Sequence, residues 1–210
     1  MSFLSIAFDT GLRRRPVGTL ALVTKVYAAV VAGWTIYAAG FSRTDILPLT
    51  ITFLSLMLVL TFILITPTTK SNPDKFPFYE WILAAAAFAC GAYFVTESDT
   101  ISQRITLLDP LSDLDVLASL TLIILSIEAM RRTVGLGLTF IVIAFIAYNL
   151  FGDKLSGPLS HGEITLEHFL DIMVFTTDGL FGVPIRVAAT YAFLFVLFGT
   201  TLSKTGGADL

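Results

Sequence analysis

The feature that most constrains this chain is a series of long apolar runs. Six segments are dominated by apolar residues: 17–41, 46–65, 79–95, 114–130, 134–151 and 185–202. A bilayer core is about 30 Å thick and is crossed by about 20 residues of α-helix. The runs are longer than the roughly ten-residue strands of a membrane β-barrel, and they do not alternate polar with apolar residues. The sequence therefore predicts an all-α integral membrane protein with about six transmembrane helices.

The composition agrees with a lipid environment. Hydrophobic residues make up 55% of the chain and charged residues only 14%, against roughly 25% charged residues in soluble domains. The net charge of −3 argues against a nucleic-acid partner, which would favour a basic face. The single cysteine, Cys90, excludes an internal disulfide, and we interpret it as a small packing residue. In the same run, Ala87 and Gly91 are small residues spaced by four, which favours close packing between membrane helices.

A secretory signal peptide is the alternative interpretation of the first run, because three arginines precede it. The core of a signal peptide spans about 7–15 residues, whereas the run at 17–41 is longer and a second run follows almost at once. We therefore expect a retained first span, preceded by a cytoplasmic N-terminal segment at residues 1–16.

The distribution of lysine and arginine predicts the orientation. Cytoplasmic loops carry an excess of both residues. With the N-terminus in the cytoplasm, the inner side would hold Arg13, Arg14, Arg15, Lys70, Lys75, Arg131, Arg132 and Lys204. The outer side would hold only Arg43, Arg104, Lys154 and Arg186. The reverse orientation would reverse this excess, so a cytoplasmic N-terminus is predicted.

A compact charged cluster lies between the fourth and fifth runs. Glu128 precedes Arg131 by three residues and Arg132 by four, so both guanidinium groups can reach its carboxylate on one helical face. We interpret the cluster as an ion pair that fixes an inner turn. The alternative is that Glu128 carries a coupling proton or ion, since an acid within a membrane span is a functional candidate by default.

The long segment 152–184 is predicted to lie on the outer side. Residues 165–179 have a helical pattern, with Thr165 as the expected N-cap and with Glu167, Asp171 and Asp178 near one face. This pattern predicts an amphipathic helix at the membrane surface. His161 and His168 lie close to acids in this segment, but their spacing matches no metal-ligand set, and solvated polar residues are favoured. The chain shows no nucleophile–base pair, phosphate loop or dinucleotide fingerprint, so no enzyme activity, catalytic residue, metal site or cofactor-binding residue is predicted.

The C-terminal third resembles a known family. The order "EAMRRTVGLGL", a short span, a surface helix, "GVP", "TYAFLFVLFG" and "SKTGG" is similar to the fused permease of tripartite ATP-independent periplasmic (TRAP) transporters, TAXI subgroup. The resemblance covers about residues 126–210. Residues 1–125 match only in their general character of several spans joined by short loops.

The resemblance implies a secondary transporter of the bacterial cytoplasmic (inner) membrane. Such permeases take up organic acids with a periplasmic solute-binding protein, driven by a sodium or proton gradient. Residues 17–130 would then form a four-helix part like the small subunit, and residues 131–210 the start of a part like the large subunit. The hairpins that hold ion and substrate in the family would lie beyond Leu210, so no binding residue is carried over. The remaining part of the permease and the lipid bilayer are the other expected partners. A non-transporting membrane scaffold or assembly subunit is the second hypothesis.

Overall fold

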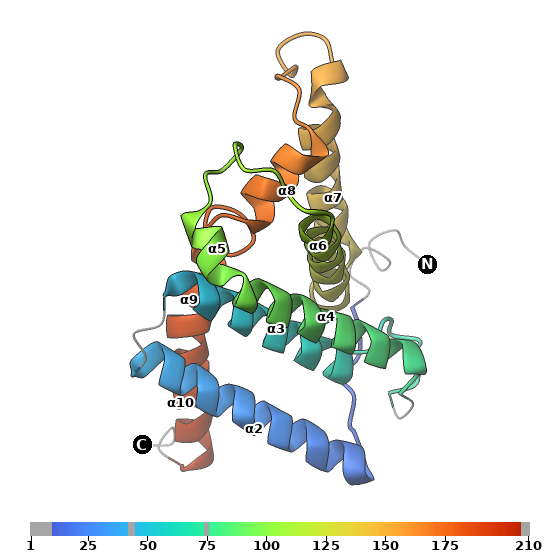
Figure 1. The fold of residues 1–210 in the computed structure, drawn as a ribbon. Helices are drawn as coiled ribbons and strands as arrows, with labels where there is room; N and C mark the ends of the chain where they lie inside the picture. The colour runs from blue at the N-terminus through green and yellow to red at the C-terminus, as the bar shows by residue number, and fades with distance from the viewer. Residues whose placement is uncertain (1–9, 42–44, 74–75, 207–210) are drawn as a thin grey trace.

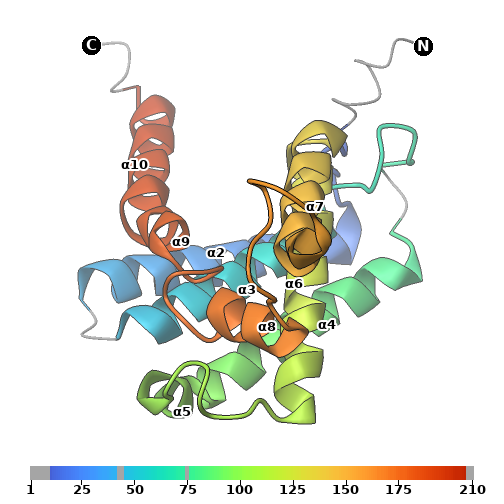
Figure 2. The same ribbon diagram turned by 90° about the horizontal axis from the view of Figure 1, so that it is seen from above.

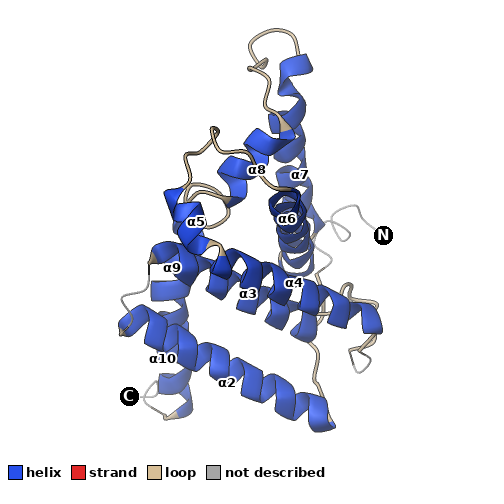
Figure 3. Ribbon diagram, in the orientation of Figure 1, coloured by secondary structure: helices blue, strands red, loops and turns tan. Residues whose placement is uncertain are grey.

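The structure is a computed structural model that describes residues 10–41, 45–73 and 76–206, and these residues fold almost entirely as helices (Figure 3). Of the predicted cytoplasmic segment 1–16, residues 1–9 lie outside the described residues. The α-helices are α2 (Gly18–Gly40), α3 (Ile46–Leu64), α4 (Phe78–Thr96), α5 (Ser98–Gln103), α6 (Asp113–Thr133), α7 (Leu136–Phe151), α8 (Leu166–Val174), α9 (Val183–Val187) and α10 (Phe193–Lys204). A 3-10 turn, η1 (Gly152–Lys154), follows α7, and a π-helical turn, η2 (Ala188–Ala192), joins α9 to α10. The all-helical fold class is therefore confirmed.

Five helical segments are long and apolar enough to cross a membrane: Gly18–Gly40, Ile46–Leu64, Phe78–Thr96, Leu136–Lys154 and Val183–Lys204. The predicted count of six spans is not confirmed. The fourth predicted span, 114–130, does form the helix α6, but α6 is not among these five. It carries acids in its first turn and Arg131 and Arg132 in its last turn, which lower its apolar character. A membrane crossing by α6 stays a prediction.

The closest helix pair is α3 with α4, and small side chains make it possible. Gly91 faces Ser55, and a methyl group on Gly91 would collide with the Ser55 side chain. The Ser55 hydroxyl donates a 2.8 Å hydrogen bond to the Ala87 carbonyl oxygen. Hydroxyl-to-backbone bonds and glycine contacts let membrane helices approach closely. The Ala87 and Gly91 pair therefore serves helix packing, as its spacing predicted.

The helices fall into two groups. In both views α2, α3 and α4 run side by side, while α6, α7 and α10 cross them obliquely (Figures 1 and 2). The α3–α4 loop, the α6–α7 turn and the far end of α10 lie toward the top of Figure 2, and α5 and α8 lie toward its bottom.

The helix α8 differs from its prediction in length and in surroundings. Thr165 caps it as expected, since its hydroxyl accepts a bond from the His168 amide, but it ends at Val174 instead of residue 179. The chain then folds back, and the Leu180 amide donates a 2.7 Å bond to the Met173 carbonyl oxygen. A side chain on Gly179 would collide with that carbonyl group, so this turn favours glycine.

The acids of α8 do not share one solvated face, since Glu167 is exposed and Asp171 is buried. Asp171 is only 3% exposed, and Asp178 lies beyond the end of the helix. Phe169, Leu170 and Val174 are buried, and α8 packs on α6 and α7. The predicted position of this helix at a membrane surface is therefore not confirmed.

Candidate functional site

The cluster predicted from the sequence forms as an ion pair. The Glu128 carboxylate accepts two bonds from Arg131, each 2.8 Å long, and one of 2.7 Å from Nε of Arg132. The i to i+3 and i to i+4 spacing on α6 brings all three side chains to one face. The Arg131 side chain also reaches across to the Pro67 carbonyl oxygen at 2.9 Å. The cluster thus ties the end of α6 to the α3–α4 loop.

Two residues that the sequence did not single out complete this cluster. Glu80, in the first turn of α4, is fully buried and accepts a 2.9 Å bond from Nη2 of Arg14 and a 2.7 Å bond from Nη1 of Arg132. Arg14 is 4% exposed and Arg132 is 1% exposed. The signal that was available is an acid inside an apolar run, at "YEW" (79–81), with no basic neighbour of its own. Such an acid needs a partner from elsewhere in the chain, because buried charges are paired.

The backbone of the N-terminal segment is bonded into the same place. The Arg14 amide donates to the Leu64 carbonyl oxygen at 2.7 Å, and Arg13 and Ile65 form an isolated antiparallel bridge. The Gly11 amide donates to the Arg132 carbonyl oxygen at 2.7 Å. A side chain on Gly11 would collide with the Thr66 carbonyl group, so glycine is what allows this approach.

We call this assembly the arginine end of the protein, comprising residues 11–14, 64–67, 80 and 128–132. Its side chains form an alternating chain of charges in the order Arg14, Glu80, Arg132, Glu128, Arg131. The three guanidinium groups and two carboxylates of these five side chains carry a local charge of +1, in which the exposed Arg13 is not counted. The guanidinium of Arg14 also lies over the Phe76 ring, and that of Arg132 lies over the Phe62 ring, where cation–π attraction favours it.

This geometry suits a structural joint. Each of the two carboxylates has two guanidinium partners, so neither is free to hold a further cation. An intramembrane acid that carries a coupling ion must exchange its partner during the cycle, whereas Glu80 is held from both sides by residues of separate segments. The arrangement favours the fixing role for Glu128 over the ion-carrying role.

A second polar cluster lies at the other end of α4 and α6, and we call it the acidic end: residues 93, 104–115 and 165–171. Arg104 approaches the buried Asp171 at 3.6 Å, and the Leu107 amide donates a 2.6 Å bond to the same carboxylate. The Tyr93 hydroxyl donates a 2.7 Å bond to Asp115. Arg104 and Asp171, which the sequence assigns to the outer side, thus contact each other, and Arg14, Arg131 and Arg132 of the predicted inner side meet at the arginine end.

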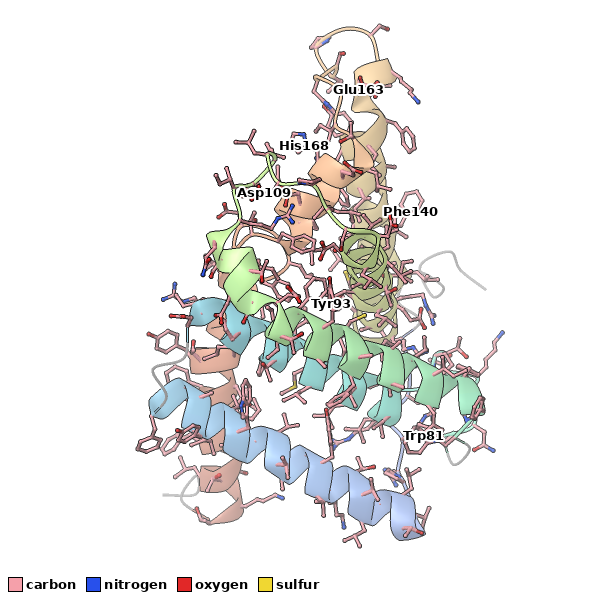
Figure 4. All side chains as sticks on the ribbon, viewed as in Figure 1. Trp81, Tyr93, Asp109, Phe140, Glu163 and His168 are labelled. Carbon is pink, nitrogen blue, oxygen red and sulfur yellow. The ribbon has the colours of Figure 1, made fainter. Side chains whose placement is uncertain are left out.

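A polar hollow of about 350 Å³ lies at the acidic end, between the 107–111 loop and α8. Asp109 and His168 both lie on its walls, and Figure 4 shows them on neighbouring segments, apart from the tip of the loop that carries Glu163. His161 lies elsewhere and contacts α7. Within the described ranges, no three His, Cys, Asp or Glu side chains are grouped to hold a metal ion.

Comparisons with known proteins give no match: no protein-family model, curated protein or solved structure is similar to this chain.

Proposed function

We propose that this chain is a membrane permease component of an ion-gradient-driven uptake system of the TRAP type. In this proposal it lies in the bacterial cytoplasmic membrane with its N-terminus in the cytoplasm, and it works with a periplasmic solute-binding protein to take up organic acids. The coupling ion is sodium or a proton. The motif order in residues 126–210 suggests the transport class.

The structural observation that carries the proposal is a contrast in burial among the helices. The helix α3 is largely buried inside the protein, whereas α2, with 17% of its apolar window buried, and the segments that contain α7 and α10 are largely bare. More than half (56%) of the apolar window of α3 is buried inside the protein. The corresponding share is 11% for the segment that begins with α7 and 6% for the segment that ends with α10. Phe140 on α7 points away from the body (Figure 4).

Helices that are apolar all round need lipid or further membrane helices as surroundings. Between α6, α7 and α8 there is also an apolar cavity of about 550 Å³. The ion pairs of the arginine end fix the positions of α4 and α6, while the spans that contain α7 and α10 expose apolar surface. Such a unit is suited to bind the moving helices of a larger permease.

The second candidate is a non-transporting membrane scaffold or assembly subunit. The observation that favours it is the pairing at the arginine end, where both Glu80 and Glu128 are engaged by arginine. No carboxylate of that end is left for ion coupling. A scaffold would use the same bare helices for assembly alone.

Uptake by membrane vesicles separates the two candidates. Vesicles would carry the full-length protein with its genomically neighbouring permease and binding-protein partners, and labelled organic acids would be offered with a sodium or proton gradient. The transport proposal expects uptake that needs both the gradient and the binding protein. Gradient-dependent uptake that persists when this chain is deleted would assign it to the scaffold class. Absence of uptake with every acid tested would refute the transport class.

A further inference from the structure

The loop 155–162 is fastened to the end of α7 by two aromatic side chains. Nε2 of His161 lies 3.0 Å from the Tyr148 carbonyl oxygen, and Nδ1 lies 2.7 Å from the Gly162 carbonyl oxygen. The Tyr148 hydroxyl donates a 2.8 Å bond to the Leu159 carbonyl oxygen. The two rings meet edge to face, with centroids 5.2 Å apart. These contacts join the loop to α7 at two points.

The position of the His161 ring depends on Gly152, which begins η1 directly after α7. A methyl group added to Gly152 would collide with Nε2 and Cδ2 of the ring. Gly152 is buried beneath the ring, although the loop around it is largely exposed. The absence of a side chain at Gly152 thus leaves a seat for the imidazole ring.

Both ring nitrogens of His161 face carbonyl oxygens, and carbonyl oxygens only accept hydrogen bonds. A neutral imidazole carries one N–H donor and one lone pair, so one of the two contacts would then bring two acceptors together. An imidazolium carries two N–H donors and satisfies both carbonyl groups. We propose that loop 155–162 is a proton-operated latch, in which doubly protonated His161 fastens the loop to α7 and neutral His161 releases it.

The electrostatic surroundings agree with this reading. The carbonyl oxygens of Gly162 and then Tyr148 raise the pKa of His161 above its ordinary value, and the negative charge of Asp153 in η1 adds to the effect. The other charged groups nearby are Lys154, whose Nζ lies over the Phe151 ring, and Glu163 in the loop itself.

The sign of the pH effect follows from the raised pKa. A group whose pKa is higher in the fastened state favours that state when it is protonated. Fastening is therefore complete at low pH and is lost as the pH rises through the pKa of the fastened state. The latch does not depend on the proposed transport function.

The first test observes the protonation directly. The chain has two histidines, so ring-nitrogen NMR of the full-length protein labelled with ¹⁵N-histidine gives two sets of signals, which a His168→Gln variant assigns. We expect the His161 signals to keep the imidazolium signature at a pH above the ordinary histidine range. In Gly152→Ala, which fills the seat, we expect the midpoint to return toward the ordinary value. An unshifted midpoint in the unmodified protein would overturn the proposal.

The second test observes the loop. Spin labels at positions 156 and 141, in a background without the native cysteine, report the distance between the loop and α7 by pulsed electron resonance. We expect a narrow distance distribution below the His161 midpoint and a broad one above it. In His161→Gln, whose amide does not titrate, the distribution should be independent of pH. The same pH dependence in His161→Gln, or none in the labelled parent protein, would overturn the latch.

Discussion

The charge balance of the arginine end predicts which substitution there lowers the free energy of unfolding more, Glu80→Gln or Arg132→Met. Glu80→Gln keeps the shape of the side chain but removes its charge, so the local charge rises from +1 to +2 and Arg14 is left buried without a carboxylate. Removing one partner of a buried ion pair costs about 3–5 kcal/mol. Arg132→Met removes more hydrogen bonds, to Glu80, Glu128 and the Ile65 carbonyl oxygen. Yet it leaves each glutamate with one arginine and a local charge of zero.

We therefore expect Arg132→Met to lower the free energy of unfolding by about 1–2 kcal/mol, which is less than Glu80→Gln does. The same logic predicts that Arg14→Met has opposite effects in two backgrounds. In the unmodified protein it removes a partner of Glu80 and should destabilise. In Glu80→Gln it removes an uncompensated buried charge and should raise the free energy of unfolding.

Reversible unfolding of the purified protein in mixed micelles, followed by circular dichroism, measures these differences. The four proteins needed for the Arg14 and Glu80 comparison form a double-mutant cycle, which isolates the interaction between the two sites. A larger loss for Arg132→Met than for Glu80→Gln would show that the number of hydrogen bonds, and not the charge balance, governs this site. Further destabilisation of Glu80→Gln by Arg14→Met would refute the account outright.

Three further outcomes are expected. Gly11→Ala should destabilise by about 1–3 kcal/mol because the added methyl group collides with backbone. Unfolding measurements would detect this loss, with Gly33→Ala and Gly40→Ala in α2, where a methyl group meets no other atom, as controls. Gly91→Ala should lower the free energy of unfolding by a similar amount, because the methyl group pushes α4 away from α3. Adding Ser55→Gly to this variant should restore part of the lost stability. A Gly91→Ala variant as stable as the unmodified protein would contradict the packing described. Cysteines placed one at a time in a cysteine-free background should react with an impermeant reagent added to cells when they lie in 152–163 but not in 66–78, and the reverse result would invert the proposed orientation.

Local signals in the sequence were sufficient to predict the first three long helices and the contacts among Glu128, Arg131 and Arg132. The apolar runs predicted the positions of α2, α3 and α4 to within a residue or two at each end, because lipid-facing backbone leaves few alternatives to a helix. The contacts of Glu128 with Arg131 and Arg132 follow from helical spacing alone. They needed no knowledge of the tertiary fold.

The other features of the site and the fold depend on contacts between segments that are distant in the sequence. Glu80 is 66 residues from Arg14 and 52 from Arg132, and nothing in the local pattern of either arginine indicates the other. The predicted boundary between residues 17–130 and 131–210 falls inside α6, between Glu128 and its two arginine partners. The early end of α8 reflects the turn at Gly179, where close contact with backbone, and not hydrophobic periodicity, ends the helix.

The bridge between Arg13 and Ile65 also fixes an order of events during synthesis. Residues 11–14 leave the ribosome before their partners at positions 64–66, 80 and 132 do. The bond from the Gly11 amide to the Arg132 carbonyl oxygen cannot form until residue 132 has been made and the end of α6 has come to this segment. Closing a chain loop of this length has an entropic cost that grows slowly with its length, so the delay adds little to that cost. Residues 11–14 thus take their final position only after α4 and α6 have been made, and a failure to insert α4 would leave Arg14 without the carboxylate of Glu80.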